Sequence, residues 1–161
     1  MTKFLALTAM LALPAVAAVA QAPMTAPTYV MKAGAGDQYE IQSSRLLLAS
    51  TKNAKLRSFA AMMVADHTKS TADVKAAAMR ADLHPAPPKL DAMGAKNIAA
   101  LRATTGTARD RLYVEQQKAA HQRALTLHEA YSQTGTAAPL KTTAAAIAPV
   151  VQTHIGELSS M

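Results

Sequence analysis

The sequence predicts an all-α protein, an antiparallel four-helix bundle with a short crossover helix. Over long segments, apolar residues recur every three or four positions, which is the period of a helix that buries one face. No run alternates apolar and polar residues for long enough to indicate a β-strand. The breaks between the helical segments come in the order short, long, short, and an antiparallel bundle with one long crossover requires this order.

Five segments carry the helical pattern, namely residues 35–50, 54–83, 90–104, 107–133 and 138–158. The first break is the polar stretch 50–53. The second is the proline-rich stretch 84–88, because proline cannot continue the hydrogen-bond ladder of a helix. The segment 90–104 is the short crossover helix and ends near Gly106, and a turn at 134–136 separates the last two helices.

The first 22 residues are expected to be a cleavable signal peptide. A short basic start containing Lys3 precedes an apolar run over residues 4–20, and the sequence Ala20-Gln21-Ala22 places small residues where signal peptidase requires them. We predict a cut after Ala22 and a periplasmic or secreted mature protein. The alternative is a membrane anchor, but a spanning helix needs about 20 apolar residues and usually lacks such a cleavage site. The mature chain is then expected to have no transmembrane segment.

Removing residues 1–22 leaves 139 residues, about one ordinary domain. We expect a flexible N-terminal segment at 23–34 and a helical bundle domain at 35–158. The chain contains no Cys, which excludes a disulfide, thiol chemistry and a lipid anchor on Cys after the apolar run. The fold must therefore be stabilised by packing, by a partner or by a bound ion.

The charge of the chain excludes one class of partner. Loss of Lys3 lowers the formal net charge from +7 to +6, and the basic residues are spread singly along the chain. A nucleic-acid-binding protein usually carries a basic stripe with interleaved aromatic residues, whereas only Phe59 and four Tyr remain after the cut. We therefore expect no nucleic-acid partner. Weak association with anionic lipid or polysaccharide of the envelope stays open, and the sequence names no specific partner.

Each of the four long helices is predicted to direct one potential metal ligand inward. His67 and His154 lie on apolar stripes, while Glu40 and His121 lie at the edges of theirs. Counted from the turns at 1.5 Å per residue, Glu40 and His67 lie within one turn of the same level. His121 and His154 differ by about one turn, and Glu115 is the better-levelled partner of His154. With Asp66 added as a carboxylate near the core, the candidate metal ligands are Glu40, Asp66, His67, Glu115, His121 and His154.

Three imidazoles with carboxylates suit a divalent ion of zinc, iron, copper or manganese. The alternative is a non-catalytic envelope interaction or stress-related protein without metal, in which the inward polar residues only hydrogen-bond one another. His84 and His128 are expected to lie outside the site, the second near the surface. We predict no catalytic residue, because the sequence has neither a Gly-x-Ser-x-Gly elbow nor a phosphate-binding glycine loop.

Three segments carry a family resemblance. FAAMMVADHT at 59–68, YVEQQKAAH at 113–121 and APVVQTH at 148–154 resemble the bacterial family of unknown function 4142. Its members are often labelled predicted outer membrane proteins and grouped with ferritin-like bundles. The resemblance covers residues 34–158 and implies a ferritin-like fold and an envelope location, but no established role. It does not imply a di-iron centre, because no acidic residue here precedes a His by three positions.

Overall fold

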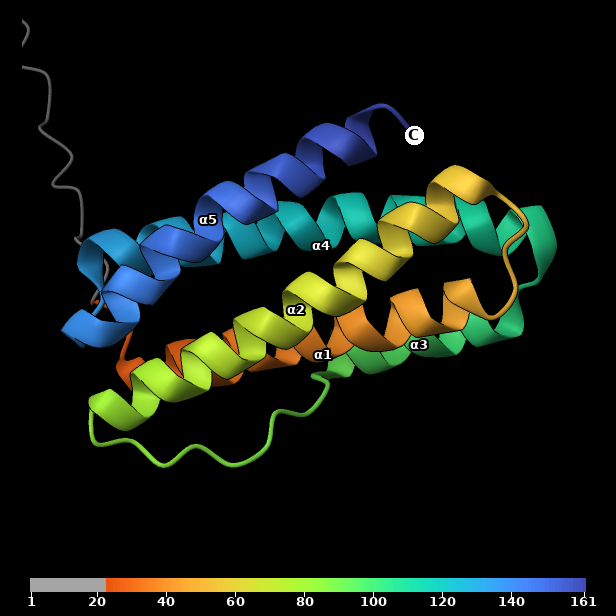
Figure 1. The fold of residues 1–161 in the computed structure, drawn as a ribbon. Coiled ribbons are helices and arrows are strands. Elements are labelled where there is room, and N and C mark those ends of the chain that lie inside the picture. Colours follow the sequence, from red (N-terminus) through yellow and green to blue (C-terminus); the bar gives the residue numbers. More distant parts are fainter. Residues whose placement is uncertain (1–22) are drawn as a thin grey trace, which may run out of the picture.

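The computed structural model describes residues 23–161, which form five helices and no strand. The helices are α1 (Ala26–Leu48), α2 (Ala54–Arg80), α3 (Ala92–Ala103), α4 (Gly106–Thr134) and α5 (Ala138–Ser159). α1 pairs with α2, α4 pairs with α5, and the long connection that carries α3 joins the two pairs (Figure 1). The predicted all-α bundle with a short crossover helix is confirmed. The expected signal peptide at 1–22 lies outside the described residues.

Polar side chains mark the starts of three helices. The backbone N–H of Leu56 donates to Asn53 Oδ1 at 3.2 Å, and that of Gly94 donates to Asp91 Oδ1 at 2.6 Å. Thr25 caps α1 in the same way. These bonds satisfy amides that the first turn of a helix leaves without intrahelical acceptors. The local sequence therefore sets where α1, α2 and α3 begin.

α1 begins nine residues before its expected start, so the prediction of a flexible segment at 23–34 is wrong from Ala26 onwards. Pro27 lies in the first turn, where its missing N–H would have no intrahelical partner in any case. Tyr29 is fully buried and stacks on Tyr131, with 3.9 Å between the ring centroids. This packing outweighs the low helix propensity of the nearby glycines. The other helix ends lie within three residues of the predicted ones.

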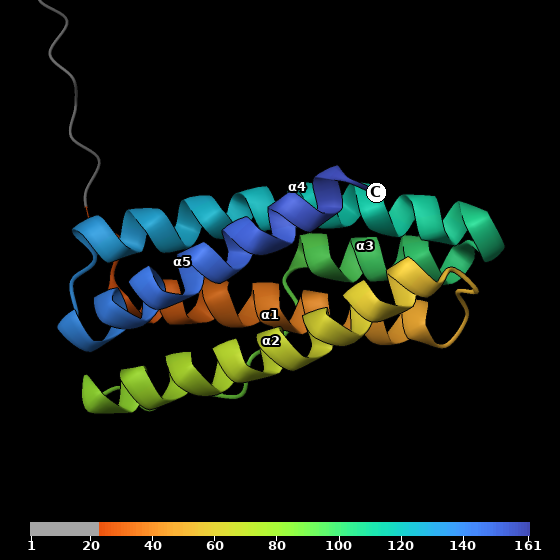
Figure 2. The same ribbon diagram turned by 45° about the horizontal axis from the view of Figure 1, so that its top comes forward.

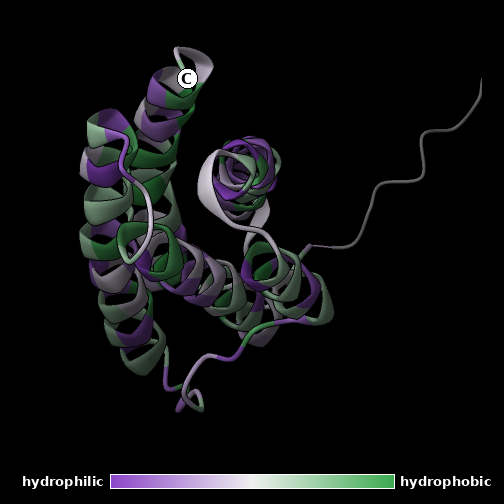
Figure 3. Ribbon diagram, turned by 90° about the vertical axis from the view of Figure 1, so that its right-hand side faces the viewer, coloured by the Kyte–Doolittle hydropathy of each residue, from purple (hydrophilic) through white to green (hydrophobic). Residues whose placement is uncertain are grey.

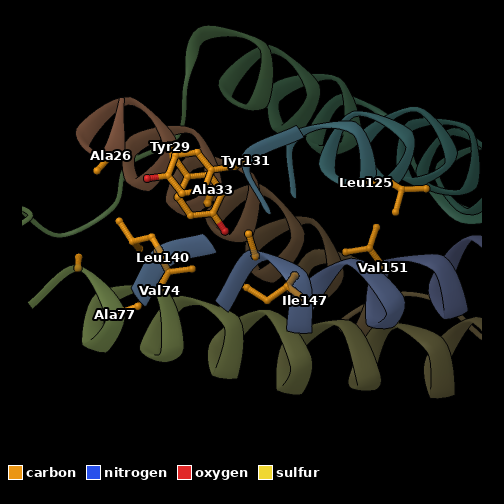
Figure 4. Close-up of a cluster of buried hydrophobic side chains, with 12 residues drawn as sticks. Ala26, Tyr29, Ala33, Val74, Ala77, Leu125, Tyr131, Leu140, Ile147 and Val151 are labelled. Carbon is orange, nitrogen blue, oxygen red and sulfur yellow. The ribbon is translucent and has the colours of Figure 1, made fainter. Parts of the chain in front are cut away.

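Buried apolar side chains form two clusters, one toward each end of the bundle. Figure 4 shows the first cluster, which holds Ala26, Tyr29, Ala33, Val74, Ala77, Ala78, Leu125, Tyr131, Leu140, Ala144, Ile147 and Val151. The second cluster holds Tyr39, Leu47, Leu56, Phe59, Ala60, Met63, Ile98, Leu101, Tyr113, Ala120 and Leu158. Along α2, α4 and α5, the residues between the two clusters include buried histidines. A polar layer thus separates two apolar cores.

The crossover helix completes one side of the bundle. α3 packs against α1 and α4, which the rotated view shows (Figure 2). Hydrophobic and hydrophilic residues are interleaved along the helices, as expected for amphipathic helices that pack around a shared core (Figure 3). Among residues 23–161, no helix has the length and apolar character that a bilayer span requires.

Two glycines of α1 provide a matched test of this packing. A Cβ at Gly34 would lie 2.7 Å from Pro88 Cβ, whereas a Cβ at Gly36 meets no described atom within 4 Å. We expect Gly36→Ala to raise the free energy of unfolding by about 0.5–1 kcal/mol, because alanine is the better helix former. Gly34→Ala should lower that free energy by about 1–3 kcal/mol relative to Gly36→Ala, because the added methyl group overlaps a stiff proline ring.

Urea unfolding of the wild type and both variants measures the two changes. If Gly34→Ala proved as stabilising as Gly36→Ala, the close contact between α1 and the proline-rich connection would be refuted.

Candidate metal centre

Three histidines from three helices meet in the polar layer. His67 lies on α2, His121 on α4 and His154 on α5, and their exposed fractions are 5%, 0% and 2%. One ring nitrogen of each histidine lies within 4.8 Å of the corresponding nitrogens of the other two. The three ring centroids are separated by 5.3 to 5.7 Å. We call these three residues the His triad.

The apolar stripes of the helices bring the His triad together. His67 follows Met63 of the second cluster by one helical turn, and His154 lies between Val151 of the first cluster and Leu158 of the second. Packing each stripe against the core therefore turns the imidazoles inward. The ring of Phe59 packs against both His121 and His154, with 6.4 Å between centroids in each case, and supports the triad from one side.

One nitrogen of each ring is held by an oxygen that can only accept a hydrogen bond. His67 Nδ1 lies 2.8 Å from Asp37 Oδ1, and His154 Nε2 lies 2.9 Å from Asp66 Oδ2. His121 Nδ1 lies 3.0 Å from the carbonyl oxygen of Gln117. Because ionised carboxylates and carbonyls cannot donate, the N–H of each ring is on this outer nitrogen. In a neutral ring, the other nitrogen then carries a lone pair.

The remaining nitrogens fit a shared ion. His121 Nε2 and His154 Nδ1 lie 3.3 Å apart, so two lone pairs face each other when both rings are neutral. His67 Nε2 is buried and has no hydrogen-bond partner among residues 23–161. Two nitrogens that bind one ion at about 2.0–2.1 Å with tetrahedral angles are about 3.3 Å apart. The donor set and its spacing therefore suit a transition-metal ion.

Burial keeps two imidazoles of the triad neutral. It lowers the pKa of His121 to about 3, with the positive charge of His67 acting in the same direction. Burial also lowers the pKa of His154, against the opposing effect of Asp66. At His67, burial likewise disfavours the charged form, but the hydrogen bond to Asp37 and the charge of Glu40 outweigh it and raise the pKa. A metal ion that binds His67 must therefore displace a proton.

Three carboxylates surround the triad. Asp37 holds His67 and also accepts from Thr71 Oγ1 at 3.0 Å. Glu40 Oε1 lies 3.8 Å from His121 Nδ1, and burial raises the pKa of Glu40 to about 7, although the nearby His67 charge lowers it. The Asp66 side chain is 38% exposed, so the residue that holds His154 also reaches the surface.

The structure brings together three of the six predicted ligands. His67, His121 and His154 converge, and Glu40 and Asp66 contact the triad from outside. Glu115 is exposed on α4 and does not reach the triad. Counting residues from the turn estimated how far along the bundle axis Glu115 lies, but not the direction in which its side chain points. Six residues rotate a helix by about 600°, which is not a whole number of turns, so Glu115 lies on a different side of α4 from His121.

Two further residues depart from the expectation. His128 is buried and hydrogen-bonded through Nδ1 to the Tyr29 hydroxyl at 3.0 Å, so its expected place near the surface is wrong. Seven residues are about two helical turns, which places it on the same face as His121. Asp37 was not predicted as a site residue. Its spacing of three from Glu40 is the signal that places both carboxylates on one face of α1.

Burial of a neutral His121 is expected to cost the metal-free protein folding stability as the pH falls below about 6.5. Between that value and about 3, an unfolded chain protonates His121, whereas the folded chain keeps it neutral. His121→Gln should therefore reduce the slope of unfolding free energy against pH by up to about 1.4 kcal/mol per pH unit between pH 6 and 4. Urea unfolding in the presence of a chelator measures the slope.

His84→Gln is the control, because His84 is exposed. His67 acts in the opposite sense, because its pKa is raised in the folded protein. Its contribution to the free energy of unfolding is present below about pH 6.5 and is lost as the pH rises through its folded pKa. Equal slopes in the wild type and His121→Gln would contradict a buried neutral imidazole.

Comparisons with known proteins agree with this architecture. Among curated proteins there is no match. A solved structure titled "CopM in the Cu(II)-bound form" is similar, with a TM-score of 0.68 and 16% sequence identity over 85% of this chain and 96% of that chain. At this identity, the likeness concerns the fold. A family profile described as "Domain of unknown function (DUF4142)" matches residues 11–161, which confirms the resemblance found in the sequence. The chain therefore belongs to the DUF4142 family.

Proposed function

We propose that this protein is an exported metal-binding bundle whose His triad holds one divalent transition-metal ion, with copper as the first candidate. The observation that carries the proposal is the hydrogen-bond pattern of the triad. Each imidazole uses one nitrogen to donate to Asp37, Asp66 or the Gln117 carbonyl, which leaves the second nitrogen as a ligand. Metal-binding histidines characteristically have such outer partners, which fix the ring orientation.

The charges around the triad support a dication. A bare divalent ion in a protein interior is costly unless negative groups compensate it. Asp37 and Asp66 contact His67 and His154 directly, and two ionised carboxylates balance the charge of one divalent ion. The residues of the triad thus bind the ion, while the two aspartates orient the rings and offset its charge.

The donor set favours copper or zinc. Neutral imidazole nitrogens suit copper, zinc, iron and nickel, whereas manganese prefers oxygen ligands. Copper(II) binds a given nitrogen site more tightly than the neighbouring divalent metals do. CopM, whose fold is similar, is described in a Cu(II)-bound form. A bound copper ion would be either stored cargo or a redox-active centre. In both cases the chain's own residues would bind the ion and limit its contact with water.

The alternative of a metal-free interaction protein fits the triad less well. If the imidazoles served only to hydrogen-bond one another, each inner nitrogen would need a partner. His67 Nε2 has none in the part of the chain that the structure describes. The proposal of an exported location rests on the apolar start and the small residues at Ala20 and Ala22.

Purified mature protein titrated with copper(II) is expected to bind one ion per chain by elemental analysis. His67→Ala, His121→Ala and His154→Ala should each weaken binding at least tenfold, because each removes one of three ligands. His128→Ala is the buried control and His84→Ala the exposed one, and both should keep one ion. Copper at 100 times its dissociation constant should stabilise the wild type by about 2.7 kcal/mol.

Zinc in parallel titrations identifies the preferred metal. The proposal fails if the wild type retains no stoichiometric metal. It also fails if the triad variants retain as much metal as the two control variants.

The outer carboxylates give a finer test of the same site. Asp37→Asn and Asp66→Asn are each expected to lower metal affinity about 10–100-fold, because the amide still accepts a hydrogen bond but lacks the charge. Asp73→Asn is the matched control, since Asp73 is a half-buried residue of α2 that is paired with Lys69 and does not contact the His triad. Competition with a chromophoric chelator measures the affinities. Wild-type affinity in both Asp37→Asn and Asp66→Asn would remove these residues from the site.

A further inference from the structure

A cavity of about 420 Å³ connects the protein surface with the polar layer. It is bounded by residues of α1, α3 and α4, with His67 contributed by α2. Lys32, Gly36 and Met93 are exposed lining residues, whereas Glu40 and His67 are buried ones. Since one water occupies about 30 Å³ of liquid, the volume suffices for an ion with on the order of ten waters. We call this hollow the α1–α4 cavity.

The buried part of the α1–α4 cavity is lined by residues that need a partner. Among the described residues, His67 Nε2 and Glu40 Oε2 are both buried without a hydrogen-bond partner. Both residues line the cavity; His67 belongs to the His triad, and Glu40 lies beside His121. His67 is the only member of the triad among the described lining residues. An ion that comes through the cavity therefore meets Glu40 and His67 before it meets the other two imidazoles.

A second hollow is the competing route. It has a volume of about 320 Å³, lies between α2 and α5, and is lined by Asp66, Ser70 and Ile147 among others. Of the described residues near the triad, it reaches Asp66, whose carboxylate is engaged by His154. This hollow thus approaches the outer side of one imidazole, whereas the α1–α4 cavity reaches a triad member itself.

We propose that the α1–α4 cavity is the passage by which the metal ion reaches and leaves the His triad, and that Glu40 receives the ion on the way. This inference rests on the proposed function. A carboxylate along the passage replaces part of the hydration shell before the imidazoles bind, which reduces the cost of taking a dication out of water. The cavity lining places the carboxylates Asp37, Glu40 and Asp91 along this path, beside the cations Lys32 and Arg123.

Gly36 allows the passage to be narrowed without a clash. It lines the α1–α4 cavity, and a Cβ at this position meets no described atom within 4 Å. A leucine there would occupy the cavity. Gly156 on α5 is the matched control, because it has the same open surroundings and does not line either hollow. Ala146→Leu narrows the competing hollow, since Ala146 is exposed and lines it.

The experiment mixes metal-free full-length mature protein with copper(II) buffered by glycine and follows binding by stopped-flow absorbance. Gly36→Leu is expected to slow association at least tenfold, with stoichiometry and equilibrium affinity within twofold of the wild type. The affinity is preserved because a narrowed passage slows entrance and release alike. Gly156→Leu and Ala146→Leu should bind at the wild-type rate. Circular dichroism checks that each variant is folded.

Glu40→Gln tests the receiving carboxylate. Glu40→Gln should lower the association rate constant by a severalfold larger factor than it lowers the equilibrium affinity. Glu40→Asp should restore most of the association rate. A purely structural role for Glu40 would instead change stability and affinity without this kinetic difference.

The outcomes separate this inference from the proposed function. If the wild type binds copper but Gly36→Leu associates at the wild-type rate, the passage is wrong while the metal site stands. If only Ala146→Leu slows association, the ion uses the hollow between α2 and α5. If the wild type binds no metal, the proposed function itself is refuted, and the passage with it.

Discussion

The burial of ionisable groups in the middle of an apolar bundle is the constraint on which the rest of the structure depends. His67, His121 and His154 are almost completely buried, and each ring has an N–H that needs an acceptor. Asp37 and Asp66 supply two of these acceptors from side chains, and the backbone of α4 supplies the third. Because the three rings and their partners together lie on all four long helices, the layer constrains the rotation of each helix about its axis.

The two apolar clusters supply the folding free energy that offsets the cost of burying this polar layer. The cluster around Tyr29 and Tyr131 and the cluster around Phe59 and Tyr113 bury large side chains on either side of the histidines. Apolar burial is the main source of folding free energy, and the polar layer contributes little to it. The clusters therefore hold the helices together, and the layer between them is available for binding. This division explains why a chain without Cys can keep a polar cluster in its core.

Membership of the DUF4142 family does not by itself assign a metal site to this chain. The family carries no assigned role, and the likeness to CopM concerns the fold. The proposed metal binding rests on this chain's own atoms: the 3.3 Å separation of two ring nitrogens, the Nε2 of His67 without a partner among residues 23–161, and the carboxylates that flank the triad. The cavity beside Glu40 adds a physical connection between this layer and solvent.

The sequence by itself predicted the helices and the three imidazoles, because helical periodicity, proline breaks and position on an apolar stripe are local properties. Four of the five helix starts lie within two residues of the prediction, and all three inward histidines converge. The exception is α1, whose early start depends on the stacking of Tyr29 against Tyr131, a contact 102 residues apart in the chain.

Only the tertiary structure decided which carboxylates serve the site. Asp37 holds His67 because α1 and α2 pack with those two faces together, and Glu115 points to solvent although its level along α4 was suitable. Buried His128 follows the same rule, since its partner Tyr29 belongs to another helix. Local sequence determines the face on which a residue lies. The facing partner depends on the rotation and crossing of packed helices, which all their side chains decide together.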